Sequence, residues 1–103
     1  MNRIEKLREM LRTSPNDSFL NHALALEYIK LGDDQQAGIL FEALLANEPG
    51  YVGSYYHIAK LKERNGETEA AIFWYEKGME ITLLAGDKHA YGELRSAYEE
   101  LTF

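Results

Sequence analysis

Apolar residues recur every three or four positions through most of this chain, a spacing typical of helices with one buried side. One such stripe consists of Leu20, Leu24, Tyr28 and Leu31. The pattern predicts six helices and no strands. The first helix is expected over residues 3–12 and the last over residues 88–101, with two helix pairs between them.

Polar residues and glycines separate the apolar stripes and predict where helices begin and end. Short oxygen-bearing side chains accept hydrogen bonds from the unpaired N–H groups at a helix start. The candidate caps are Asn16, Asp17, Ser18, Asp33, Asp34 and Thr68. Gly32 is expected to end the first helix of the first pair, because glycine readily takes the left-handed conformation of a C-terminal cap.

The sequence matches itself when it is shifted by 34 residues. The identical pairs are Pro15 and Pro49, Ala25 and Ala59, Gly32 and Gly66, Ala37 and Ala71, and Glu42 and Glu76. Backbone geometry and close packing select prolines, glycines and alanines, so this period indicates a structural repeat. We predict a single domain over residues 1–103, with a half-repeat helix in 1–14, repeats in 18–49 and 52–83, and a capping helix in 88–101.

Composition and charge narrow the class of function. Apolar residues make up 46% of the chain and charged residues 27%, an ordinary globular balance, and the absence of cysteine excludes disulfides and cysteine-based zinc sites. The net charge of −6 argues against nucleic acid as the main partner, because phosphate binding needs a basic surface. No apolar run is long enough for a signal peptide or a bilayer span, so we expect a cytoplasmic protein without membrane contact.

The repeating residues resemble the tetratricopeptide repeat over about residues 18–83. The first repeat carries Leu24, Ala25, Tyr28, Gly32, Ala37, Phe41 and Pro49, and the second carries Tyr55, Ile58, Ala59, Gly66, Ala71, Tyr75 and Gly78. The resemblance implies an all-α fold, a right-handed superhelix of about six antiparallel helices. The chain departs from the family pattern at Asn21, Leu44 and Lys62. The last helix fits the pattern best if about two residues are inserted before it, and Arg95 then stands where the family prefers a small residue, which suits a capping helix.

Stacked helix pairs have an inner surface that the first helix of each pair lines. The predicted groove residues are Phe19, His22, Leu26 and Ile29 in the first repeat and Tyr56, Lys60 and Glu63 in the second. The last helix is expected to add Tyr91 or Tyr98. The first helix of the first repeat is apolar on two faces, more than packing against its neighbours requires. We therefore predict an adaptor or co-chaperone-like interaction module that binds a peptide or helix of a partner protein in this groove.

Two other interpretations of these residues stay open. In one, Phe19, Leu26 and Ile29 belong to the core and a terminal helix covers them. In the other, the chain is a self-associating unit that forms a homodimer through the groove or the helical ends. One subclass of the family clamps chaperone tails with lysine, asparagine and arginine, but His22 and Leu26 stand at two of those positions here.

Catalysis and metal binding have little support in the sequence. His22, His57 and His89 lie about one repeat apart, and no pair of them has the i, i+4 spacing of a metal site on a helix. The glycines mark turns and form no phosphate-binding loop, and no serine has a neighbouring base that would activate it. We predict no enzyme activity and no cofactor, with a metal-dependent enzyme as a remote alternative.

Overall fold

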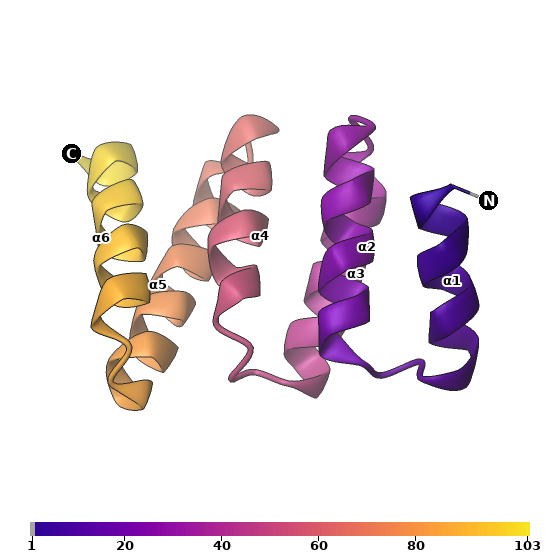
Figure 1. Ribbon diagram of the computed structural model, residues 1–103. Coiled ribbons are helices and arrows are strands. Elements are labelled where there is room, and N and C mark those ends of the chain that lie inside the picture. The colour runs from indigo at the N-terminus through magenta and orange to yellow at the C-terminus, as the bar shows by residue number, and fades with distance from the viewer. Residues whose placement is uncertain (1) are drawn as a thin grey trace. The chain divides into compact units, whose positions relative to one another are not determined.

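The computed structural model describes residues 2–103, and within this range the chain forms six α-helices and no strand. The helices are α1 (Arg3–Thr13), α2 (Ser18–Lys30), α3 (Asp34–Asn47), α4 (Gly53–Arg64), α5 (Thr68–Ala85) and α6 (Lys88–Thr102). Figure 1 shows them in chain order, joined by short connections. The predicted all-α class and the predicted number of helices are confirmed for the described residues.

Aspartate side chains cap three of the helix starts. The Leu20 N–H donates to Asp17 at 2.9 Å at the start of α2, and the Ala90 N–H donates to Asp87 at 3.1 Å at the start of α6. Asp33 caps α3 in the same way. The prediction that Thr68 caps α5 is wrong, because Thr68 is already the first helical residue and the residue before it makes no side-chain cap hydrogen bond.

Glycines end three helices in the left-handed conformation, where side chains are strained. Gly32, Gly66 and Gly86 have φ angles of +81°, +77° and +72°. Each directs the chain into the next helix within a few residues. Leu31, expected in the apolar stripe of α2, is 69% exposed, because it occupies the C-cap position just before the turn.

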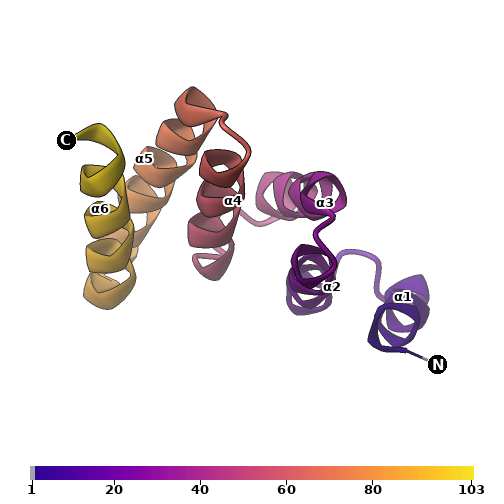
Figure 2. The same cartoon turned by 90° about the horizontal axis from the view of Figure 1, so that it is seen from above.

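The described chain groups into two compact units, Met1–Pro49 and Gly50–Phe103. In the first unit, α2 packs against both α1 and α3 (Figure 2). Ala25 on α2 and Ala37 on α3 are fully buried, which lets these two helices approach closely, and Phe41 fills the space beside them. Leu7 is the buried residue of α1.

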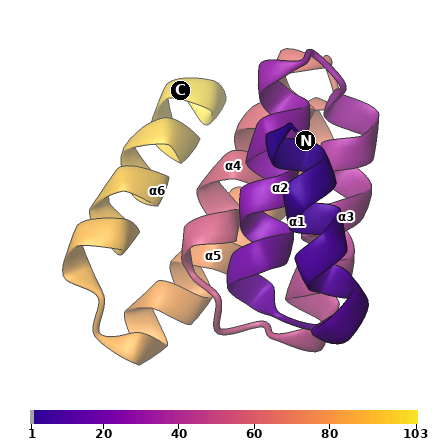
Figure 3. The ribbon, with the colours of Figure 1, turned by 45° about the vertical axis from the view of Figure 1, so that its right-hand side comes forward.

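In the second unit, α5 packs against α4 on one side and α6 on the other, and a short turn joins α5 to α6 (Figure 3). Ala59 on α4 and Ala71 on α5 are fully buried, as their equivalents are in the first unit. Gly78 lies so close to α4 and α6 that an added Cβ would stand 2.7 Å from Tyr55 Cβ and 2.9 Å from Leu94 Cδ1. The three helices therefore share one tightly packed core.

Candidate functional site

The residues predicted for the groove in the first repeat lie along α2, and the structure leaves all four in partial or full contact with solvent. Phe19 is 67% exposed, and His22, Leu26 and Ile29 are half-buried. The His22 ring meets the Phe41 ring edge-on, with 5.6 Å between the ring centroids. The exposure of Phe19 argues against the interpretation in which it is a covered core residue.

The predicted residues of the second repeat form a connected polar cluster on α4. Lys60 Nζ lies 5.7 Å from the centre of the Tyr56 ring and 3.5 Å from Glu63 Oε2. The Tyr75 hydroxyl, from α5, donates a hydrogen bond of 2.8 Å to the same Glu63 oxygen. Glu63 therefore interacts with both Lys60 and Tyr75. Lys60 also lies over the face of the Tyr56 ring, which attracts cations.

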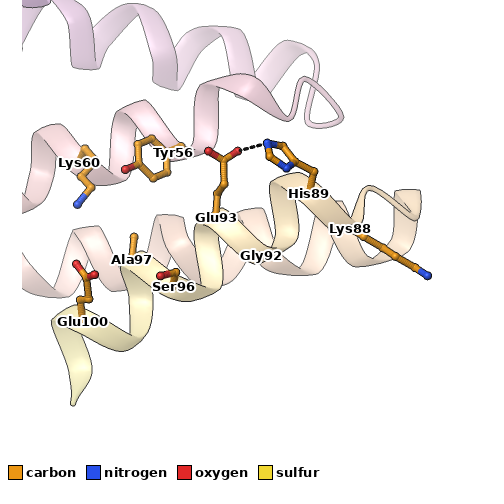
Figure 4. A pocket seen from close by; sticks show the side chains of 9 residues that line it. All are labelled: Tyr56, Lys60, Lys88, His89, Gly92, Glu93, Ser96, Ala97 and Glu100. Atoms are coloured by element: carbon orange, nitrogen blue, oxygen red, sulfur yellow. Dashed lines mark ion pairs between the residues drawn. The ribbon is translucent and has the colours of Figure 1, made fainter.

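An open groove of about 530 Å³ lies between α4 and α6 in the second unit. Its lining residues are Tyr56 and Lys60 from α4, and Lys88, His89, Gly92, Glu93, Ser96, Ala97 and Glu100 from α6. In Figure 4, Tyr56 and Lys60 face the α6 side chains, whereas Lys88 points away. His89 Nε2 and Glu93 Oε1 lie 3.3 Å apart at one end of the groove.

Small residues on α6 keep this groove open. Gly92, Ser96 and Ala97 lie opposite the α4 side chains and present little bulk. A Cβ added at Gly92 would meet no atom within 4 Å, so the space beside this residue is free. The groove therefore has room for a side chain or a short backbone segment of another molecule.

Of the residues predicted on α4, Tyr56 and Lys60 line this groove and Glu63 does not, and the α6 residues that line it were not among the predicted ones. Tyr91 and Tyr98, the residues expected from the last helix, line a different hollow with Met79 of α5 instead. The spacing of the buried residues indicates which residues form the α6 wall. The buried residues Ile58 and Leu94 are 36 positions apart, and the same shift carries Tyr56 to Gly92 and Lys60 to Ser96.

The groove is mixed in charge, with acidic groups near its Lys60 end. Burial, the hydrogen bond to Glu63 and the negative charges of Glu63 and Glu100 together raise the pKa of the Tyr75 hydroxyl far above its ordinary value. Tyr75 therefore stays a neutral hydrogen-bond donor into the alkaline range in which an ordinary tyrosine ionises. On the same helix as Tyr56, burial and the charge of Arg64 lower the pKa of His57.

Within residues 2–103, no group of three or more histidine, aspartate or glutamate side chains is arranged to hold a metal ion. None of the helices described is both long and apolar enough to cross a membrane. At the positions of the chaperone-tail clamp, α2 carries His22 and Leu26, and Lys60 is the groove cation of α4.

Comparison with known proteins identifies the repeat. Residues 52–82 match the tetratricopeptide repeat family, close to the predicted second repeat. A tetratricopeptide repeat-containing protein of Pseudomonas aeruginosa is 25% identical over 91 residues, which cover 88% of this chain and 87% of the relative.

Solved structures give the same result. A tetratricopeptide repeat domain protein of Salinibacter ruber, determined in solution, is 39% identical with a TM-score of 0.81, over 85% of this chain and 89% of that one. A crystal structure of a tetratricopeptide repeat domain protein from this organism is also 39% identical, with a TM-score of 0.78 over 82% and 94% of the two chains. A solution structure from Bordetella parapertussis, 22% identical, has the same fold with a TM-score of 0.85, over 98% of this chain and 88% of that chain.

Proposed function

Because this chain belongs to the tetratricopeptide repeat family, we propose that it binds a peptide segment of a partner protein in the groove between α4 and α6. The observation that carries the proposal is the groove itself, about 530 Å³ in volume and lined by a tyrosine, a histidine, two lysines, two glutamates and three small residues. Binding sites for small ligands and side chains typically have volumes of this order. The protein acts as an adaptor, without catalysis and without a cofactor.

The lining residues favour an extended segment with both apolar and polar side chains. Tyr56 offers a broad, half-open ring against which an apolar or aromatic side chain of the partner packs. Lys60 on the α4 wall and Ser96 and Glu100 on the α6 wall offer hydrogen bonds and charges. Since these polar groups are partly solvated, they select among peptides more than they strengthen binding.

In the first unit, the face of α2 provides a separate apolar surface for a protein partner. Phe19 is its most exposed member, with Leu26 and Ile29 half-buried beside it. Scattered apolar residues are common on protein surfaces, but three on one helix face form a continuous contact surface. We propose that this face adds apolar contacts to the same partner protein.

The affinity for one short peptide is expected to be modest. Ordering a flexible segment and losing its translational freedom offset much of the favourable burial in an open groove. A dissociation constant on the order of 1 μM or weaker is the expected result.

The test selects short peptides from a random displayed library on the purified protein and measures their affinity by isothermal titration calorimetry. Gly92→Trp adds a large side chain at a groove position where a Cβ meets no atom within 4 Å. We expect this variant to bind the selected peptides at least about tenfold more weakly, because the groove is filled. Peptides that bind Gly92→Trp as tightly as the wild type contradict the proposal.

Two further variants separate groove binding from other effects. Gln35→Trp adds the same side chain at an exposed position on α3 and is expected to leave peptide affinity unchanged. Leu26→Glu tests the α2 surface: we expect weaker binding of a longer partner segment with helicity retained. Loss of helicity in Leu26→Glu would instead assign Leu26 to the core.

A further inference from the structure

One face of α6 differs from the corresponding faces of α2 and α4. Counting from the buried residues Leu24, Ile58 and Leu94, equivalent positions are 34 residues apart between α2 and α4 and 36 apart between α4 and α6. At the position of close helix contact, α2 has Ala25 and α4 has Ala59, both fully buried. The equivalent residue on α6 is Arg95, whose side chain is 58% exposed.

The reason for this difference is that α2 and α4 are each covered by the second helix of their own pair. The helices α3 and α5 lie over those faces and bury the alanines. Within Gly50–Phe103, α6 packs against α5 and α4, and no helix of this unit lies over its outer face. This face, which we call the Arg95 face, consists of Tyr91, Arg95, Tyr98, Glu99 and Phe103.

The Arg95 face carries aromatic side chains beside its two charged residues and is partly open to solvent. With Met79 of α5 it encloses a hollow of about 350 Å³, and Tyr91 also borders an apolar hollow of about 150 Å³ beside Leu83. Leu83 is 66% exposed and Phe103 is 94% exposed. Aromatic and aliphatic groups concentrated in this way on one side of a small unit mark an interaction surface.

The charges on this face are complementary to themselves. Arg95 Nε and Glu99 Oε2 lie 3.4 Å apart, one helical turn from each other. When two copies of α6 are placed antiparallel about a two-fold axis that passes between Arg95 and Glu99 at the level of residue 97, Arg95 of each copy lies opposite Glu99 of the other. The same axis places Phe103 of each copy opposite Tyr91 of the other, at the junction of the two hollows.

We propose that a second copy of this chain docks on the Arg95 face, forming a two-fold dimer through antiparallel α6 helices. A two-fold interface requires a surface that complements itself, and the opposite charges of Arg95 and Glu99 meet this requirement. Along α6, Gly92 and Ser96 lie within one helical turn of Arg95, so the proposed interface borders the α6 wall of the groove.

The test is sedimentation equilibrium from about 10 μM to about 1 mM protein, because an interface of two helix faces is small and its association weak. The wild type is expected to rise from the monomer mass of 11.8 kDa toward twice that value. Arg95→Glu and Glu99→Arg each place like charges opposite one another at two points of the interface. Each is expected to weaken dimerisation at least about tenfold.

Mixing these two variants gives the sharpest result. One has two acidic side chains at positions 95 and 99 and the other has two basic ones, so an equimolar mixture restores opposite charges at both points. The mixture and the double variant Arg95→Glu/Glu99→Arg are both expected to associate within about threefold of the wild-type constant. Circular dichroism on each variant confirms that the helices remain formed.

Matched controls distinguish this interface from other modes of association. The exposed pair Glu9 and Arg12 on α1, with 3.5 Å between Glu9 Oε2 and Arg12 Nη1, receives the same charge reversals and is expected to leave dimerisation unchanged. Gln35→Trp, at an exposed position on α3, is also expected to leave it unchanged. A wild type that stays monomeric to the highest concentration, or single reversals at 95 and 99 that dimerise as well as the wild type, would overturn the proposal.

Discussion

The two helix pairs α2–α3 and α4–α5 bring equivalent backbone positions into contact, but the side chains beside these positions differ in polarity. Both bury a pair of alanines where the helices approach, Ala25 with Ala37 and Ala59 with Ala71. Beside these alanines the first pair has Phe41, and the second pair has Tyr75 at the equivalent position 34 residues later. Both rings are fully buried, so the aromatic volume is retained while the polarity changes.

A second position, which contacts the aromatic residue in the second pair, also differs between the two pairs. Ile29 on α2 corresponds to Glu63 on α4, and the Tyr75 hydroxyl donates to Glu63 at 2.8 Å. A buried hydroxyl requires a hydrogen-bond partner, whereas the Phe41 ring does not. The comparison shows that close helix contact is set by the small residues, and that the inner face of each first helix is free to differ between repeats.

The largest expected effect on stability comes from placing a residue of the first repeat at the equivalent position of the second repeat. Leu44 in α3 corresponds to Gly78 in α5, where a Cβ would stand 2.7 Å from Tyr55 Cβ. Gly78→Leu is expected to lower the free energy of unfolding by about 3 kcal/mol or more, because the side chain has no room between α4 and α6. Urea denaturation followed by circular dichroism measures this loss.

Gly92→Leu provides the matched control for the Gly78 variant. It makes the same substitution on α6 at a position where a Cβ meets no atom within 4 Å. Removing glycine from an exposed helix interior is expected to raise stability by about 0.5–1 kcal/mol. Equal denaturation midpoints for the two variants would show that the contact around Gly78 is not tight.

Much of the fold was predictable because its determinants are local. Gly32 and Gly66 end helices through their own backbone preference, and Asp17 and Asp33 cap helices only three residues away. The family resemblance then supplied the pairing of the helices. Thr68 shows the limit of this reasoning, because a suitable residue type does not determine which position starts the helix.

The candidate site was only partly predictable, because its α6 wall depends on register. α5 has 18 residues and α3 has 14, so the strict 34-residue period fails before α6. Tyr91 and Tyr98 were expected in the groove as aromatic residues, but the shift to 36 places Gly92 and Ser96 there. The hydrogen bond between Tyr75 and Glu63 joins two helices, and spacing along the sequence does not reveal it.

A second, smaller effect is expected when the polar pair of the second repeat is changed to the apolar pair of the first. Tyr75→Phe is expected to lower the free energy of unfolding by about 1–2 kcal/mol, since Glu63 loses a hydrogen-bond donor in a partly buried place. The double variant Tyr75→Phe/Glu63→Ile reproduces Phe41 and Ile29 and is expected to recover most of this loss. Chemical denaturation of the single and double variants measures the coupling.

Alkaline pH tests the same pair in the wild type. The pKa of Tyr75 is raised in the folded state, so its stabilising effect is complete below the ordinary tyrosine pKa of about 10 and is lost as the pH rises beyond that value. Stability is therefore expected to fall more steeply above about pH 10 in the wild type than in Tyr75→Phe. Identical pH profiles for the two proteins would contradict the assignment of the donor.

The smallest effect concerns His57, which corresponds to Ala23 in the first repeat. Burial, with a smaller effect from the charge of Arg64, lowers the pKa of His57 in the folded state. Protonation therefore favours unfolding: the stabilising effect is present above the ordinary histidine pKa of about 6.5 and is lost as the pH falls. His57→Ala is expected to flatten the decline in stability between about pH 7 and pH 5, measured by urea denaturation at several pH values. The imidazole resonances of the wild type supply an independent check, because a His57 signal that titrates above the ordinary value would reverse the sign of this argument.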